Sequence, residues 1–320
     1  GWFITSPLLL CPRCGSVYDK KTKEFTKLAR LSSEGRSTAT TVLALSTVEQ
    51  MKTAPDLDAS ARKLLSFTDN QQDASLQAGH FNDFVNVARV RSAIYHALPE
   101  PPGYLDYADV ASAVVSALAL RQEEYAVNPG GAAQEGRNRQ ALTEYLRYRV
   151  YHDLRRGWRV IQPNLEQCGL LRMDYDQLDA ACRGDAAWAG HEVLATASAD
   201  VRLFVARSFL DHLRRSLAID ADCLKQSYRD ILRQRVTQAL KEPWTFDEGE
   251  DPASATYYST SRQKGEFSLS SSSLLGRFLK SRRTWPGLSH DLTKQQYEKM
   301  LRALVQVLET AGYLHVEREG

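Results

Sequence analysis

The stretch "KLLSFTDNQQDASLQAGHFNDF", residues 63–84, decides the fold expected for this chain. Its apolar start, from Leu64 to Phe67, predicts a short buried strand. A polar turn follows at residues 68–72, and from Asp73 onward the sequence predicts a helix. Ligands of open α/β sheets bind at the carboxyl ends of strands. The stretch therefore predicts a strand, a turn and a helix, with a candidate binding site in the turn.

Composition and charge limit the function classes. The chain has 320 residues, 43% of them hydrophobic and 25% charged, which is typical of globular proteins. Its net charge of +2 excludes an overall basic field, so that any nucleic-acid surface has to be local. The longest apolar runs, such as "PLLLC" at residues 7–11, are too short to span a bilayer, and no secretory signal is visible. We therefore expect a protein without membrane contact.

The number and spacing of the cysteines indicate the cellular compartment. There are 5 cysteines, an odd number that is widely scattered, which does not predict a disulfide framework. A reducing, cytoplasmic location follows. The sequence also begins abruptly at Gly1 rather than at Met, which favours a fragment of a longer protein.

Helical patterns dominate most of the chain. Apolar residues at helical spacing, together with proline and glycine breaks, predict a mainly α protein. The expected helices cover residues 73–98, 107–127, 138–156, 201–217 and 222–241, while "VNPGGAAQEGRN" at residues 127–138 is expected to be a loop. The one short α/β piece lies near the N-terminus.

Cys11 and Cys14 form a possible half of a zinc site. Two thiolates separated by two residues can bind one tetrahedral Zn²⁺ from a single tight turn. No second pair with comparable spacing follows, and a redox role lacks a surrounding βαβ pattern. Cys168, Cys182 and Cys223 are interpreted as small buried hydrophobic residues instead.

The tail from residue 267 onward has the pattern of a winged helix. A serine-capped helix, a second helix at residues 293–311, a Gly312 turn and a strand starting at Tyr313 follow one another. Lys280, Arg282 and Arg283 end the first of these helices and are candidate phosphate contacts; they could equally complement the helix dipole. Winged helices also dock proteins, so the basic run leaves both roles open.

The segment "FTDNQQDASLQAGHFNDF", residues 67–84, resembles motif IV of large superfamily 2 DEAD/DEAH-type helicases of bacterial phage defence, which are Druantia DruE-like and more distantly MrfA-like. The family pattern is approximately Phe-Thr/Ser-Asp-Asn/Ser-Arg-Gln-Asp-Ala. The matching residues are Phe67, Thr68, Asp69, Asn70, Gln72, Asp73 and Ala74. Gln71 departs from the pattern, because the family usually has Arg there. The upstream "FTKLARLSSEGRSTATTVL", residues 25–43, also resembles this family.

The resemblance implies a domain organisation. It comprises a zinc-ribbon-like segment with a linker helix at 1–57, the start of a second RecA-like domain at 58–98, a helical insertion domain at 99–245, and a linker with a winged helix at 246–320. Asn70, Gln72 and Asp73 would then contact the nucleic-acid backbone beside the cleft between two RecA-like domains. From the residues alone, Asp69, Asn70 and Asp73 could instead cap the helix.

The implied partners are nucleic acid, with DNA preferred, and the remaining domains of the same helicase. The sequence contains no Gly-x-x-x-x-Gly-Lys-Ser/Thr, no Asp-Glu-x-His/Asp after an apolar strand and no Gln-x-x-Gly-Arg-x-x-Arg. ATP and Mg²⁺ would therefore be bound by the full-length parent and not by this chain alone.

Two further possibilities remain open from the sequence. Tyr145, Tyr148 and Tyr151 alternate with arginines, a pattern that fits either base stacking or a helix that buries its tyrosines. The whole chain could also be a non-catalytic protein-interaction module or a transcription regulator.

Overall fold

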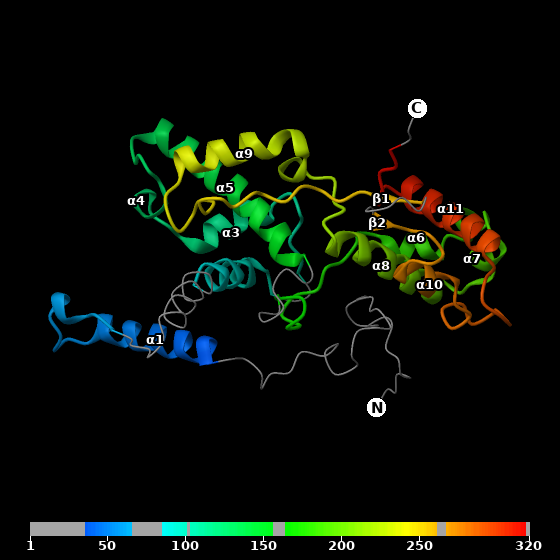
Figure 1. Ribbon diagram of the computed structural model, residues 1–320, viewed down its shortest axis with the longest axis horizontal. Coiled ribbons are helices and arrows are strands. Elements are labelled where there is room, and N and C mark those ends of the chain that lie inside the picture. The colour runs from blue at the N-terminus through cyan, green and yellow to red at the C-terminus, as the bar shows by residue number, and fades with distance from the viewer. Residues whose placement is uncertain (1–35, 66–84, 101–102, 156–163, 261–266, 318–320) are drawn as a thin grey trace. The chain divides into compact units, whose positions relative to one another are not determined.

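The structure, a computed structural model, describes residues 36–65, 85–100, 103–155, 164–260 and 267–317 (Figure 1). Helices dominate these residues, and only two short strands occur among them, so the predicted mainly α class is confirmed. The described residues group into two compact units. Unit 1 comprises those within Tyr151–Val236 and Phe246–Gly320, and unit 2 comprises those within Ala29–Val150 and Thr237–Thr245.

Unit 2 is built from helices around a small apolar core. Its elements are α1 (Arg36–Thr53), the 3-10 turn η3 (Ala59–Ala61), a helix at residues 85–97, α3 (Val110–Leu118), α4 (Gln122–Tyr125) and α5 (Ala132–Leu154), whose last turn passes into unit 1. Val114, Leu142 and Leu146 are among its buried residues. An isolated antiparallel bridge pairs Ala126 with Leu240 and so joins the two chain segments of this unit.

Two helix predictions in unit 2 were wrong in detail. The helix expected at residues 107–127 is divided into α3 and α4, because Ala119 adopts the left-handed conformation with φ 47° and ends α3. The loop expected at residues 127–138 is shorter, since α5 already begins at Ala132. The residues after Gly131 are mostly strong helix formers, which explains the early start.

The strand expected at Leu64 does not form in the described part of the stretch. Leu64 and Leu65 are 44% and 78% exposed, and neither belongs to a strand. Residues 66–84, which contain the rest of the strand, the turn and the first part of the predicted helix, lie outside the described residues. The described continuation at residues 85–97 is helical, as predicted.

Unit 1 contains the remaining elements. They are α6 (Leu178–Arg183), η4 (Asp185–Trp188), α7 (Glu192–Thr196), α8 (Ala199–Arg215), η5 (Asp222–Leu224), α9 (Gln226–Ala239), β1 (Tyr258–Ser259), β2 (Phe267–Ser268), α10 (Leu274–Lys280) and α11 (Lys294–Thr310). The last turn of α9 passes into unit 2. β1 and β2 pair in parallel, with Tyr258 opposite Phe267.

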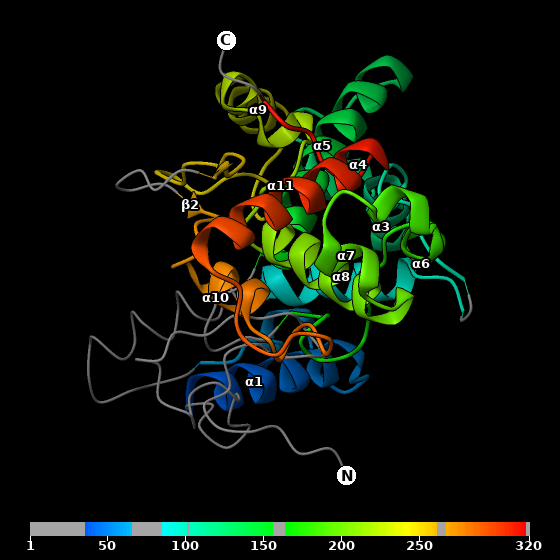
Figure 2. The same cartoon turned by 90° about the vertical axis from the view of Figure 1, so that its right-hand side faces the viewer.

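One hydrophobic core holds unit 1 together. It lies among five helices, α6, α7, α8, α10 and α11. Figure 2 shows α7, α8 and α11 close together within this unit. Trp188, Phe209, Trp285, Tyr297 and Met300 are its largest side chains, and each is buried. The core thus joins residues before position 217 with residues after position 267, so the tail packs as part of a larger helical unit.

The caps of α8, α10 and α11 explain where these helices begin. The hydroxyls of Ser198, Ser273 and Thr293 accept hydrogen bonds from backbone N–H groups in the first turns of their helices. Gln296 completes a capping box with Thr293. The predicted helix at 293–311 and the left-handed Gly312, with φ 80°, are confirmed. Residues 313–317 have no regular secondary structure, so the strand expected from Tyr313 is not formed there.

The prediction that Cys168, Cys182 and Cys223 are all buried was wrong for one of them. Cys182 and Cys223 are buried, as predicted, whereas Cys168 is exposed, because it lies in the turn that follows Asn164 rather than in a helix. Burial raises the pKa of the Cys182 thiol to about 11. Among the described residues, no helix combines the length and the apolar composition that a membrane crossing requires.

Candidate nucleic-acid interface

The C-terminal end of α10 is rigidly folded. The indole Nε1 of Trp285 donates a 2.6 Å hydrogen bond to the carbonyl oxygen of Leu279, and the Thr284 hydroxyl donates one of 2.6 Å to that of Phe278. The bond from Trp285 satisfies a carbonyl group of the kind that the end of a helix leaves without a partner, and the Phe278 carbonyl oxygen also accepts a 3.2 Å bond from the Ser281 N–H. Trp285 is also part of the core of unit 1. The segment after α10 is therefore fixed in place by a buried side chain.

The start of α10 is fixed in a different way. A Cβ atom at Gly276 would lie 2.0 Å from the carbonyl oxygen of Ser270, so only glycine fits there. The Ser273 hydroxyl accepts a 2.9 Å hydrogen bond from the Gly276 N–H. Both ends of this short helix are thus held by specific contacts, and its direction is set.

Lys280, Arg282 and Arg283, called here the α10 basic cluster, lie at this fixed helix end. Arg282 and Arg283 are exposed, and Lys280 is half-buried. The backbone carbonyl of Lys280 accepts a 2.9 Å hydrogen bond from the Leu292 N–H, which ties the segment to the start of α11. The structure thus presents two neighbouring guanidinium groups to solvent on a backbone with little freedom.

The charge balance of the α10 basic cluster is positive. Asp291 accepts a 2.9 Å hydrogen bond from the backbone N–H of Arg282, which places one carboxylate beside the cluster. The guanidinium of Arg282 donates a 3.4 Å hydrogen bond to the Ser289 carbonyl oxygen. Within the described ranges, no ion pair is formed by Lys280 or Arg283. Three cations therefore lie beside one carboxylate. Asp291 was not predicted as part of this site, because only the folded loop brings it back to Arg282.

Five further site residues were predicted from the sequence. Asn70, Gln72 and Asp73 of the motif IV turn and the possible zinc ligands Cys11 and Cys14 lie outside the described residues.

The tyrosine-rich part of α5 is a packing surface. Tyr145 and Tyr148 are buried, and the Tyr145 hydroxyl donates a 3.1 Å hydrogen bond to the Thr245 carbonyl oxygen. The guanidinium of Arg149 lies over the Tyr145 ring at 4.9 Å, where a cation–π contact forms within the protein. Of the two possibilities, burial is therefore confirmed for these two rings, and their faces are not available for stacking on bases.

Hydrogen bonds between polar side chains join α8 and the residue after it to β1. The Tyr258 hydroxyl donates a 2.9 Å hydrogen bond to the Ser216 hydroxyl and lies 3.1 Å from Nε2 of His212. Burial raises the pKa of Tyr258, so the phenol stays protonated and can remain the donor. These contacts bind the strand to the end of α8.

Comparison of the chain with protein-family models, with curated proteins and with solved structures finds no match. The resemblance of residues 67–84 to superfamily 2 helicases therefore rests on the sequence pattern itself.

Proposed function

We propose that this chain is an internal segment of an ATP-dependent superfamily 2 helicase or translocase and that it guides nucleic acid along its surface. The observation that carries the proposal is the α10 basic cluster, in which Arg282 and Arg283 are exposed on a backbone that Trp285 and Thr284 anchor. The motif IV pattern at residues 67–84 supports the choice of enzyme class.

The chemistry of the cluster suits a phosphate backbone. Guanidinium groups bind phosphate oxygens through paired, charge-assisted hydrogen bonds. Such contacts position a nucleic acid without reading its sequence, which is what a translocating enzyme needs. Because Trp285 and the Lys280–Leu292 hydrogen bond already fix the backbone, binding costs less ordering entropy than it would on a free loop.

The proposal assigns the other parts of the reaction to the full-length parent. Its remaining domains supply ATP and Mg²⁺ binding, and Asn70, Gln72 and Asp73 add backbone contacts at the interdomain cleft. Cys11 and Cys14 supply half of a zinc site, and the tail from residue 267 acts as a winged helix. DNA is the preferred nucleic acid, and the location is the cytoplasm.

The salt dependence of binding tests the proposal. In a variant with Lys280, Arg282 and Arg283 all changed to Ala, we expect the slope of log K against log salt to fall by roughly one unit for each lost phosphate contact. The matched control changes Arg121, Arg172 and Arg183 to Ala, since these are exposed arginines outside the cluster. The control should keep the slope of the unmodified chain.

An unchanged slope in the folded cluster variant would contradict nucleic-acid binding at α10. That result would favour the second candidate, a helical module that docks a partner protein. The two candidates predict different salt slopes for the same triple variant, so one titration series separates them.

A further inference from the structure

A small cavity in unit 2 lies between α3, α4 and α5. Its volume is about 230 Å³, and it opens to solvent. Seven residues line it: Val115, Ser116, Ala119, Leu120, Tyr125, Arg139 and Leu142. An apolar cavity of about 150 Å³ can hold a benzene molecule in another protein, so this volume suits a ligand with a single ring.

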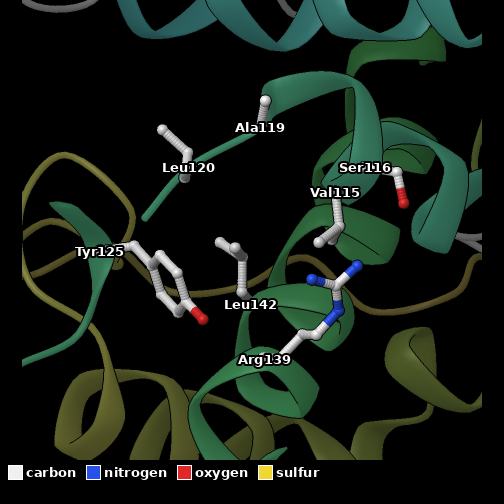
Figure 3. Close-up of a pocket in the computed structure, with 7 residues that line it drawn as sticks. All are labelled: Val115, Ser116, Ala119, Leu120, Tyr125, Arg139 and Leu142. Atoms are coloured by element: carbon white, nitrogen blue, oxygen red, sulfur yellow. The ribbon is translucent and has the colours of Figure 1, made fainter. Parts of the chain in front are cut away.

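The walls combine apolar surface with the polar side chains of Ser116, Tyr125 and Arg139. Figure 3 shows Leu142 between the Tyr125 ring and the Arg139 side chain, with the guanidinium turned toward Val115. Val115 and Leu142 are buried, whereas Arg139 is exposed. A ligand in the cavity would therefore meet aliphatic surface on its inner side and a cation at the opening.

The Ser116 hydroxyl donates a 3.0 Å hydrogen bond to the Ser112 carbonyl oxygen, whereas Tyr125 and Arg139 are available to a ligand. In the described part of the chain, Arg139 forms no ion pair, and the Tyr125 hydroxyl forms no hydrogen bond. Burial, and after it the charge of Glu135, raise the pKa of Tyr125, so its hydroxyl stays protonated and can donate. A guanidinium and a phenol O–H are both donors, and a carboxylate offers the matching acceptors.

Hydrogen bonds hold the walls in place without a ligand. The backbone of Tyr125 accepts a 2.9 Å bond from the Lys241 N–H, and Val127 donates one of 2.9 Å to the Ala239 carbonyl oxygen. The buried Asn138 donates a 3.0 Å hydrogen bond from Nδ2 to the Asn128 carbonyl oxygen, which fixes the loop before α5. The cavity is therefore already shaped, and a ligand would not need to order its walls.

Backbone strain occurs at the edge of the cavity. Ala119 has φ 47°, a left-handed conformation that residues other than glycine rarely adopt. This conformation ends α3, and the next residue, Leu120, is among those that line the cavity. Strained residues of this kind persist where the surroundings over-determine them, often at ligand sites.

We propose that this cavity binds a small carboxylate with one ring or a branched alkyl group, its charge facing Arg139 and its apolar part between Val115 and Leu142. Tyr125 donates the second hydrogen bond to the carboxylate. The site is independent of the α10 basic cluster, because all of its residues belong to unit 2.

Benzoate and benzamide form the test pair, since they share a shape and differ in charge. Titration of the whole chain, followed by calorimetry or by NMR of the ligand, should show benzoate binding in the millimolar range and benzamide binding about ten-fold more weakly. Arg139→Gln should remove this preference, because one charge-assisted hydrogen bond accounts for about a factor of ten. Glu135→Gln should strengthen benzoate binding, since it removes the negative charge that acts most strongly on Tyr125.

The matched control is Arg137→Gln, which changes an exposed arginine of the same helix that is bonded to Gln134 instead. It should leave the preference for benzoate unchanged. Leu120→Trp, at a half-buried position, fills the cavity and should abolish binding of both compounds while the helical circular dichroism is kept. Equal binding of benzoate and benzamide, or equal losses in Arg137→Gln and Arg139→Gln, would overturn the proposal.

Discussion

Arg214 donates hydrogen bonds from one terminal nitrogen to both carboxylate oxygens of Glu166, at 2.8 and 2.9 Å. Arg215 binds the same carboxylate at 2.8 Å, and both arginines also contact Asp211. Every side chain of this group is at most 10% exposed. Two buried cations are thus neutralised by two buried carboxylates, and the turn that carries Glu166 is attached to the end of α8.

Glu166→Gln should destabilise unit 1 by about 3 kcal/mol, because it leaves buried guanidinium groups without their counter-charge. Urea unfolding monitored by tryptophan fluorescence measures the change. Asp179→Asn is the control, since it breaks the exposed pair with Arg183 in α6 and should cost less than about 1 kcal/mol. Equal effects of the two substitutions would contradict the importance of burial.

The same carboxylate predicts an acid dependence. Burial opposes ionisation of Glu166, but the charges of Arg214 and Arg215 outweigh it and lower the pKa of Glu166 below its ordinary value of 4.5. Its contribution to stability is therefore complete above pH 4.5 and is lost as the pH falls through the lowered pKa. Stability curves from neutral to acid pH should be flatter for Glu166→Gln than for the unmodified chain.

Arg202→Met tests a second buried cation. The guanidinium of Arg202, 2% exposed, donates a 2.8 Å hydrogen bond to each of the carbonyl oxygens of Leu194 and Ala195, and one of 2.6 Å to Asp185. Met fills a similar volume but leaves the carbonyl group of the buried Leu194 without this donor and removes the bonds to Ala195 and Asp185, so we expect a loss of about 3 kcal/mol in the free energy of unfolding.

Arg202→Lys should recover only part of that loss, because one ammonium group cannot reproduce the fork of a guanidinium. Arg207→Met is the control in the same helix, since Arg207 is 30% exposed and pairs with the exposed Asp174. A full recovery by Lys would show that charge alone, rather than the geometry of the donors, is what α8 requires.

The sequence predicted the helical class, and the reason is visible in α11. Tyr297, Met300, Leu304 and Leu308 recur at helical spacing and are all buried, so a local pattern sufficed. The pairing of Glu166 with Arg214 and the approach of Asp291 to Arg282 were not predictable, because each depends on a turn that brings distant residues together. The cavity was missed for the same reason: it depends on the left-handed Ala119, which no local signal marks.

The zinc prediction can be tested on the intact protein. If Cys11 and Cys14 bind one tetrahedral ion, changing both to Ser should remove about one zinc per molecule in metal analysis. Changing Cys182 to Ala and exposed Cys168 to Ser should leave the metal content as it was. Unchanged zinc after loss of Cys11 and Cys14 would exclude them as ligands.

Asp291→Asn separates the charge of the α10 basic cluster from its shape. Asparagine keeps the side-chain oxygen that accepts the 2.9 Å hydrogen bond from the Arg282 N–H, so the loop should keep its conformation. Loss of the negative charge should strengthen binding of a nucleic acid by about two- to five-fold at low salt, the range of exposed charge interactions. Because the number of phosphate contacts is unchanged, the salt slope should stay the same while the affinity rises. Asp179→Asn, which removes a carboxylate from α6, is the matched control and should change neither quantity. Unaltered affinity in Asp291→Asn, with the fold retained, would show that nucleic acid does not bind beside Arg282.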